Sequence, residues 1–504
     1  MQGSCRLDRE LLDARALCGH LVGVGSVHAF LAEHRSRLFP DGLFADLFGS
    51  RRGRPSVPGE VVAVVMVLQA LEGLSDRQAC RRLATDIAWK AAAGLALTDE
   101  AFHHTVLTLW RNRLRASGDP DRVFRVVSEL IAECGAVAKS HRRVLDSTVL
   151  DDAVARQDTV TMLVNQIRRV RKLHGGLADV WVRERNLDTG GAVVDWGDPG
   201  DVERLVSELV DDALELIGTA EDLELDDAQG DAVALLALVA GQDVEPGDGP
   251  GRWRIARRTA PGRVISVVDP ESRHVHKSRS VYRDGYKAHI AAEPDTGLIT
   301  AVDLTAGDVG DARAAPGLIA DEAAGTEVYG DSAYGTGDLR AHLAEREMTA
   351  VIKPPPIQTA VDGGYSIDDF DIDIDAGTVT CPEGITVTIS PTDTARFGRR
   401  CRTCPVRARC TTAKDGRTIK IHPHHQLLKA ARKLARTDCF DHDYRRRRPM
   451  AERSIAWLVR NNRRCPYRGI HKNRQWLTTR AAAVNLKRLT NLGLTHNGRH
   501  WAIN

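Results

Sequence analysis

The chain has 504 residues, of which 42% are hydrophobic, and a net charge of +2, which is ordinary for a globular protein of two or more domains. The longest apolar run, residues 61–71, is too short to span a bilayer, and the first ten residues carry no apolar segment of a signal peptide, so we expect a soluble intracellular protein. Ten cysteines are few for this length, which favours free or metal-bound thiols over a disulfide framework.

Residues 1–140 are predicted to form a helical N-terminal domain. Three helices are expected to start at about Pro58, Ser75 and Thr98, and the second is expected to run to Gly94. Short helices joined by short turns resemble a helix-turn-helix array, which would bind DNA. A plain helical bundle fits the same pattern, so both interpretations remain open.

The pattern after residue 140 is typical of an α/β domain. The expected elements, in chain order, are a strand around Asp146, a hairpin at 284–306, a helix from 310, a strand at 326–331, a helix from 337, a strand at 349–354 and a last regular element, a helix at 448–462. A strand, an antiparallel hairpin and then alternating helices and strands form the ribonuclease-H-like arrangement, in which the first and fourth strands are neighbours in a mixed sheet.

Two insertions are expected to interrupt this core. The predicted segments are the core at 141–154, 263–356 and 441–490, a helical acidic insertion at 155–262, a Cys-containing insertion at 357–440 and a C-terminal tail at 491–504. From Asp198 to Asp248, 16 acidic residues stand against one basic residue. From Arg396 to the C-terminus, 28 Lys or Arg stand against 5 acidic residues, which favours a nucleic-acid partner over a merely solvated basic face.

Three acidic residues stand at informative places in these elements. Asp146 lies within the first strand and Asp331 ends the fourth, so their carboxylates are expected to meet at one end of the sheet. Glu452 borders an apolar stripe of the last helix, which predicts that the helix packs on the sheet and points the acid inward. Such carboxylates suit two Mg²⁺ or Mn²⁺ ions about 4 Å apart, which promote phosphodiester chemistry.

The sequence motifs around these residues resemble those of the DDE insertion-sequence transposases of the retroviral-integrase superfamily. The quoted motifs are "GRPSVPGEVVAVVMVLQALEGLSDRQACRRL" for the helical N-terminal domain, "VLDSTVL" for the first-Asp strand, "VYGDSAYG" for the second-Asp motif and "RRRPMAERSIAWLVRNN" for the Glu helix. The resemblance implies a metal-binding catalytic triad of Asp146, Asp331 and Glu452, and a helix cap at Asp311.

The family's final motif also places helper residues along the Glu helix. It spaces a Tyr, an Arg, the Glu and a basic residue, and here Tyr444, Arg448, Glu452 and Arg460 fill these roles, with Arg447 at the usual spacing from the Tyr. The basic residues expected to contact DNA are Arg445, Arg447, Arg448, Arg460 and Lys287.

The resemblance implies a DNA transposase, that is, a metal-dependent endonuclease and polynucleotidyl transferase that acts at the ends of an insertion sequence. It further implies binding to double-stranded DNA at terminal inverted repeats and at the target, action as a homodimer or larger synaptic complex, and a cytoplasmic, nucleoid-associated location of prokaryotic type. A catalytically silent, transposase-derived DNA-binding regulator is the alternative, and a nuclease without strand transfer would share the same site.

Four cysteines of the second insertion form a separate candidate site. They are Cys381 in "CPEG" and Cys401, Cys404 and Cys410 in "CRTCPVRARC". Four thiolates with a C-x2-C pair suffice for one structural Zn²⁺ in a small basic lobe. Reduced, unliganded thiols are the alternative, because the other spacings are looser than those of ordinary zinc ribbons.

Overall fold

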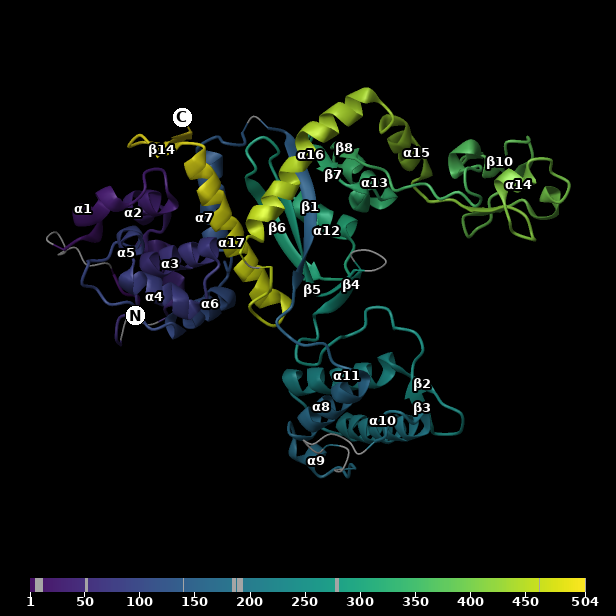
Figure 1. The fold of residues 1–504 in the computed structure, drawn as a ribbon, viewed down its shortest axis with the longest axis horizontal. Coiled ribbons are helices and arrows are strands. Elements are labelled where there is room, and N and C mark those ends of the chain that lie inside the picture. Colours follow the sequence, from purple (N-terminus) through teal and green to yellow (C-terminus); the bar gives the residue numbers. More distant parts are fainter. Residues whose placement is uncertain are drawn as a thin grey trace.

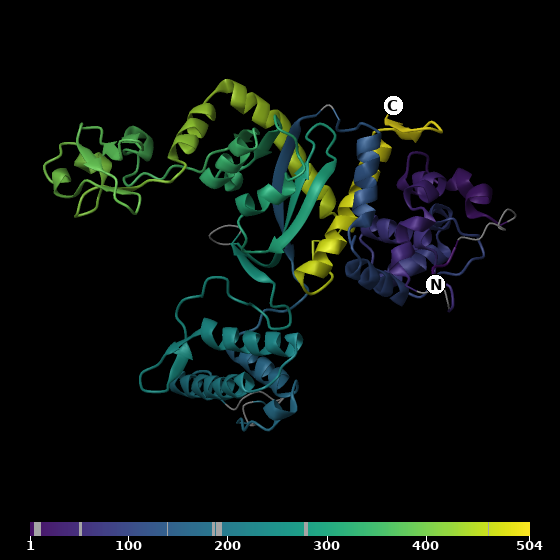
Figure 2. The same cartoon turned by 180° about the vertical axis from the view of Figure 1, so that it is seen from behind.

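The computed structural model describes residues 1–4, 12–49, 53–138, 140–183, 187, 194–276, 281–461 and 463–503. A mixed β-sheet stands at the centre, with a helical N-terminal region beside it and two smaller lobes extending from it (Figures 1 and 2). None of the described helices is long and apolar enough to cross a lipid bilayer.

The central sheet has six strands in the order β4-β5-β1-β7-β8, with β6 paired to β5. β1 and β5 pair antiparallel, as do β5 with β4 and with β6, whereas β7 pairs parallel with both β1 and β8. The strands are β1 (Arg142–Asp151), β4 (Arg273–His276), β5 (Tyr282–Ala292), β6 (Ile299–Ala306), β7 (Glu327–Gly330) and β8 (Thr349–Ile352). The predicted mixed α/β character is confirmed, and β4 is an additional edge strand.

Helices cover both faces of this sheet. On one face, Leu145 of β1 and Val328 of β7 pack with residues of α12 and α13. On the other face, Val144 of β1 and Tyr329 of β7 pack with α16, and α17 covers β6. The helices are α12 (Asp311–Leu318), α13 (Gly337–Glu345), α16 (Asp438–Leu458) and α17 (Ile470–Asn491).

The N-terminal region is helical, as predicted, but two expected helix boundaries are wrong. The stretch from Ser75 to Gly94 forms two helices, because Asp86 accepts hydrogen bonds from the backbone of the second and caps it. The helix expected from Thr98 begins at Thr105. The elements are α1 (Ala14–Cys18), α2 (Val27–Leu38), α3 (Gly59–Glu72), α4 (Asp76–Thr85), α5 (Ile87–Ala93), α6 (Thr105–Ala116) and α7 (Arg122–Glu133), with 3₁₀ turns η1 (Gly19–Leu21) and η2 (Asp41–Leu47).

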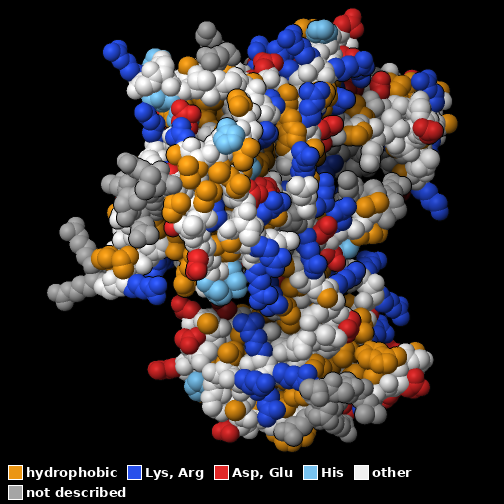
Figure 3. All heavy atoms as spheres, turned by 60° about the vertical axis from the view of Figure 1, so that its left-hand side comes forward, with side chains coloured by type: hydrophobic (Ala, Val, Ile, Leu, Met, Phe, Trp, Pro, Cys, Tyr) orange, Lys and Arg blue, Asp and Glu red, His pale blue; other side chains and the backbone are white. Residues whose placement is uncertain are grey.

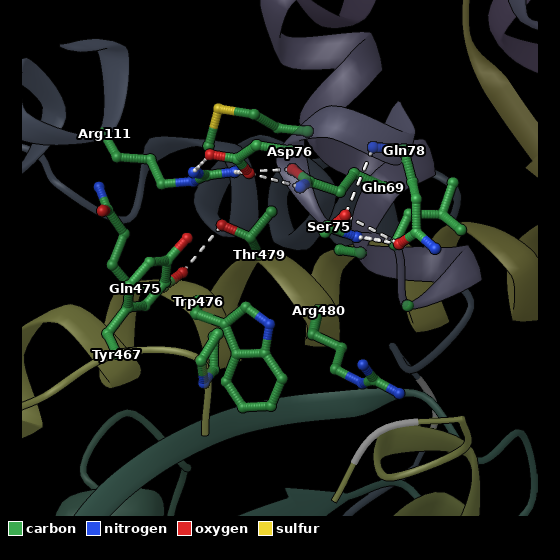
Figure 4. A pocket seen from close by; sticks show the side chains of 15 residues that line it. Gln69, Ser75, Asp76, Gln78, Arg111, Tyr467, Gln475, Trp476, Thr479 and Arg480 are labelled. Atoms are coloured by element: carbon green, nitrogen blue, oxygen red, sulfur yellow. Dashed lines mark hydrogen bonds and ion pairs between the residues drawn. The ribbon is translucent and has the colours of Figure 1, made fainter. Parts of the chain in front are cut away.

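α17 joins the helical region to the sheet, and it lies beyond the helix expected to be the last regular element. One side of it packs on β6 and another on α3 and α7. A cavity of about 400 Å³ lies at this junction, where Arg111 and Asp76 of the helical region face Trp476 and Arg480 of α17 (Figure 4). The expected tail forms a hairpin of β14 (Leu494–His496) and β15 (Trp501–Ile503), and its Trp501 packs into the helical core.

The acidic segment folds as a lobe of its own around a separate apolar core. Leu163 of α8, Leu209 of α10 and Leu236 of α11 are fully buried in it. The elements are α8 (Thr159–Arg171), α9 (Gly175–Ala178), α10 (Pro199–Glu221), α11 (Asp227–Gln242), β2 (Val244–Pro246) and β3 (Trp253–Ile255).

The Cys-containing segment forms the other lobe, which projects away from the sheet (Figure 1). Its core gathers Phe370, Val379 and Phe397 between very short strands. The elements are η5 (Ile367–Asp369), β9 (Asp371–Asp373), β10 (Thr378–Thr380), β11 (Thr386–Thr388), β12 (Thr394–Arg396), η6 (Gly398–Cys401), α14 (Arg407–Cys410), β13 (Thr418–Lys420) and, leading back to the sheet, α15 (His425–Leu434).

Candidate active site

Asp146 on β1 and Asp331 just past the end of β7 stand at equivalent positions along two neighbouring parallel strands. The pairing of β1 with β7 sets Val144 opposite Tyr329, and each aspartate follows its member of this pair by two residues. Asp331 lies just past β7, but its backbone is still extended, with φ −77° and ψ −174°. Side chains two residues apart in extended chain share a face, so both carboxylates come level with each other on the face that α16 covers.

The guanidinium of Arg448 lies between these two carboxylates. Its Nη2 and Nη1 donate to the carboxylate of Asp146 at 2.9 and 3.2 Å, and Nη2 is 4.0 Å from Oδ2 of Asp331. Burial raises the pKa of Asp146 above its usual range, and the charge of Arg448 opposes this rise. Arg448 is only 8% exposed. A single buried cation therefore lies beside both acids.

Two buried tyrosines border this group. Burial raises the pKa of Tyr334 well above its usual value, and the negative charges of Asp311, Asp146 and Asp331 add to the rise. Its hydroxyl has no hydrogen-bond partner within the described ranges. Tyr444 stands one helical turn before Arg448, and the Nζ of Lys353 lies 4.7 Å from the centre of its ring.

A further carboxylate, Asp311, lies on the opposite face of β1. It accepts hydrogen bonds from Ser147 Oγ at 2.9 Å and pairs with Lys287 Nζ at 3.1 Å. The expectation that Asp311 caps its helix is wrong, because Gly310 is the N-cap and no side chain caps this end. His289, fully buried, stands 3.9 Å away, and burial lowers its pKa to about 4. Lys287 and His289 lie in the predicted hairpin and Asp311 in the helix predicted after it, but no spacing in the sequence indicates that they meet.

Glu452 lies on α16 four residues after Arg448, and therefore on the same side of that helix. Its side chain is exposed, whereas Ala451, Ile455 and Leu458 are buried as predicted. In the described part of the chain, its carboxylate takes part in no hydrogen bond or ion pair. The structure thus brings Asp146 and Asp331 together and leaves Glu452 facing solvent.

The basic residues expected to contact DNA differ in how available they are. Arg445 is 78% exposed and pairs with Asp441 at 3.0 Å, and Arg460 is also exposed. Arg447 is buried, pairs with Asp443 and lies over the ring of Tyr329. Arg448 and Lys287 are held by the acids described above. Of the five residues, Arg445 and Arg460 can therefore contact DNA without first breaking an ion pair with a buried partner.

The carboxylates offer a partial fit to a metal ion. Asp146 and Asp331 supply hard oxygen ligands at one level of the sheet, which suits Mg²⁺. As the side chains lie, however, no three His, Cys, Asp or Glu among the described residues are grouped so that they could hold a metal ion. Seating an ion would require Arg448 to leave Asp146 and Glu452 to turn toward it.

Comparisons with known proteins found two matches to protein families. Residues 380–490 match a family model described as a transposase DDE domain, and this segment contains Glu452 and the candidate zinc ligands Cys381, Cys401, Cys404 and Cys410. Residues 29–113 match a transposase domain known as DUF772, and this segment spans the helices α3, α4 and α5. A comparison with curated proteins and another with solved structures found no match.

Both matches are to transposase families. In the sequence, one match precedes and the other follows the segments that contain Asp146 and Asp331. They agree with the motifs that carry the resemblance, at the helical N-terminal region and at the Glu helix. The chain is therefore related to the DDE transposases of insertion sequences, as its sequence predicts.

Proposed function

We propose that this chain is a DNA transposase that cleaves and joins phosphodiester bonds at the ends of an insertion sequence, with the central sheet as a ribonuclease-H-like catalytic domain. The observation that carries the proposal is that Asp146 on β1 and Asp331 just past β7 each follow the paired residues Val144 and Tyr329 by two positions. The match of the Glu helix to a transposase DDE domain supports it. The proposed core is 141–154, 263–356 and 441–490, with 1–140 as a DNA-binding domain.

Asp146 and Asp331 are the proposed ligands of the reactive centre, and Glu452 is the third. Two Mg²⁺ or Mn²⁺ ions at this place would activate a water or a DNA 3′-hydroxyl and stabilise the leaving oxygen. Two carboxylates side by side repel each other, and Arg448 now supplies one positive charge against their two negative charges. A doubly charged cation compensates them better and leaves the guanidinium of Arg448 free to bind a DNA phosphate.

Double-stranded DNA is the proposed partner, at the ends of the element and at the target. Lys and Arg side chains are numerous along the middle of the face shown in Figure 3. Arg445 and Arg460 are exposed, and both belong to the basic C-terminal segment, residues 396–504. We place the chain at the nucleoid in the cytoplasm, acting as a homodimer or larger synaptic complex on DNA.

The test uses DNA duplexes that carry the sequences flanking the chain's own gene. Purified full-length protein with Mg²⁺ or Mn²⁺ should nick these duplexes at the element ends and join the freed 3′ ends to a second duplex, as resolved on sequencing gels. Cleavage without joining would identify a nuclease. Binding with no cleavage at any metal concentration would contradict the proposal and identify a DNA-binding regulator.

Glu452→Gln should reduce the rate of strand cleavage at least about 10³-fold, because the proposed metal centre loses a hard ligand. Such a centre lowers the activation free energy of cleavage by several kcal/mol. Since Glu452 is exposed and unpaired within the described residues, the change should leave the melting temperature and DNA affinity unchanged. Cleavage rates and DNA binding are measured side by side. Glu345→Gln, at an exposed position of α13, is the matched control and should cleave like the wild type. Equal cleavage by both variants would remove Glu452 from the site.

A further inference from the structure

Four of the five cysteines of the second insertion surround one small cavity. Cys381, Cys401, Cys404 and Cys410 all line a space of about 20 Å³ inside the lobe. All four are free, so no disulfide explains why they gather there. The cavity is large enough for a single water-sized particle, and therefore for a single ion.

The backbone around the cysteines forms tight turns of the kind that present thiolates to one centre. Gly384 N–H donates to the carbonyl of Cys381 at 2.9 Å, and the φ of +74° at Gly384 favours a glycine there. The backbone N–H of Arg417 points at Cys401 Sγ, 3.5 Å away. A hydrogen bond of this kind stabilises a thiolate more than a neutral thiol, because the charged sulfur is the better acceptor.

Basic side chains complete the surroundings of the cavity. Arg400, Arg407 and Arg417 line it together with the cysteines. The Nε of Arg417 is buried and has no hydrogen-bond acceptor within the described ranges. Four thiolates around one Zn²⁺ carry a net charge of −2, so these guanidinium groups would lie beside an anion that compensates their charge.

The apolar core of the lobe is small, so a bound ion would add to its stability. Its five strands, β9 to β13, have three residues each, and the fully enclosed aromatic side chains are Phe370 and Phe397. Domains of this size commonly need a metal ion or a disulfide to remain folded. The described residues of this lobe offer the four thiols at the cavity and no disulfide.

We propose that this lobe binds one structural Zn²⁺ through Cys381, Cys401, Cys404 and Cys410. As the side chains lie, no three of these thiols are grouped as metal ligands, so binding would require their sulfurs to turn toward the cavity that all four line. Binding releases the protons of the thiols. The site is separate from the carboxylate centre, so it stands or falls independently of the catalytic proposal.

The test measures zinc in the full-length chain purified from zinc-supplemented cells. We expect about one zinc per chain after dialysis, by mass spectrometry of the metal. The Cys401→Ser plus Cys404→Ser double variant should lose it, because two of four ligands are gone. Cys439→Ser, an exposed position on α16, is the matched control and should keep its zinc.

Cobalt substitution separates ligand loss from misfolding. Co²⁺ in the folded wild-type protein should give the strong visible bands of a tetrahedral site and a sulfur-to-cobalt charge-transfer band of four-thiolate intensity. Cys404→His, which keeps a ligand, should retain zinc and lose about a quarter of that intensity. A wild-type protein with neither zinc nor these bands, or a double variant with undiminished zinc, would overturn the proposal.

Discussion

Asp331→Asn should lower strand cleavage and strand transfer at least about 10³-fold, while binding to the same DNA persists. The carboxylate charge is lost, and with it a hard ligand of the proposed metal centre. The fold should survive, because Asp331 Oδ1 accepts a hydrogen bond from the backbone N–H of Ala333 and an Asn oxygen can accept the same bond. Three quantities are measured for each protein: the rates of nicking and joining, the DNA affinity by gel shift, and the melting temperature.

Asp338→Asn is the matched control for this variant. Asp338 lies seven residues further on, in the first turn of α13, and its side chain is 82% exposed. It should cleave and bind as the wild type does. Asp146→Asn is the less clean variant, because it also leaves the buried Arg448 without its strongest partner. Retained cleavage by Asp331→Asn would remove this residue from the chemistry.

Arg111→Ala should destabilise the helical region by about 3–5 kcal/mol, because it leaves a partly buried acid without its cation. Two nitrogens of Arg111 donate to Asp76 at 2.8 and 2.9 Å, and one also donates to Gln69 at 2.7 Å (Figure 4). Although burial alone would raise it, these bonds hold the pKa of Asp76 below its usual value. Urea unfolding followed by far-ultraviolet circular dichroism measures the loss.

The pH dependence of this loss has a definite sign. A carboxylate with a lowered pKa in the folded state contributes stability above its unfolded pKa, and this contribution disappears as the pH falls through the folded value. The penalty of Arg111→Ala should therefore be full at neutral pH and shrink below about pH 4. Arg125→Ala is the matched control, because Arg125 is 46% exposed and pairs with Asp119 and Glu129. We expect at most about 1 kcal/mol there, and equal losses in both variants would contradict the argument.

The order of the central elements could be predicted because local patterns specify it. β1, the β5–β6 hairpin, β7 and β8 are short apolar or β-branched runs bounded by polar and glycine residues, and all appear where the sequence indicates them. The usual rule of right-handed crossovers predicts the adjacency of β1 and β7, and this adjacency accounts for the meeting of Asp146 and Asp331. Here local pattern and topology point to the same arrangement.

Other parts of the fold depend on contacts that no local pattern shows. α17 carries Arg474, Arg480 and Arg488 among its apolar residues, so its sequence reads as a basic surface, yet Arg480 is only 2% exposed at the junction with the helical region. β4 exists because the edge of β5 is available to pair with it. Such elements are decided by packing between distant segments.

The candidate site was predictable as a set of acids, but its present arrangement was not. The stripe of Ala451, Ile455 and Leu458 correctly predicts how α16 packs, and yet Glu452 beside it is exposed rather than pointed inward. The pairing of Arg448 with Asp146 joins residues 302 positions apart, and sequence spacing cannot indicate such a contact.

The most direct test of the central claim is a crystal structure of the full-length chain soaked in Mn²⁺, with anomalous scattering used to locate the metal. We expect two manganese peaks about 4 Å apart between Asp146 and Asp331, with Glu452 turned in as a ligand and Arg448 withdrawn from Asp146. Manganese bound only elsewhere, with Arg448 still bridging the two aspartates at saturating metal, would contradict it.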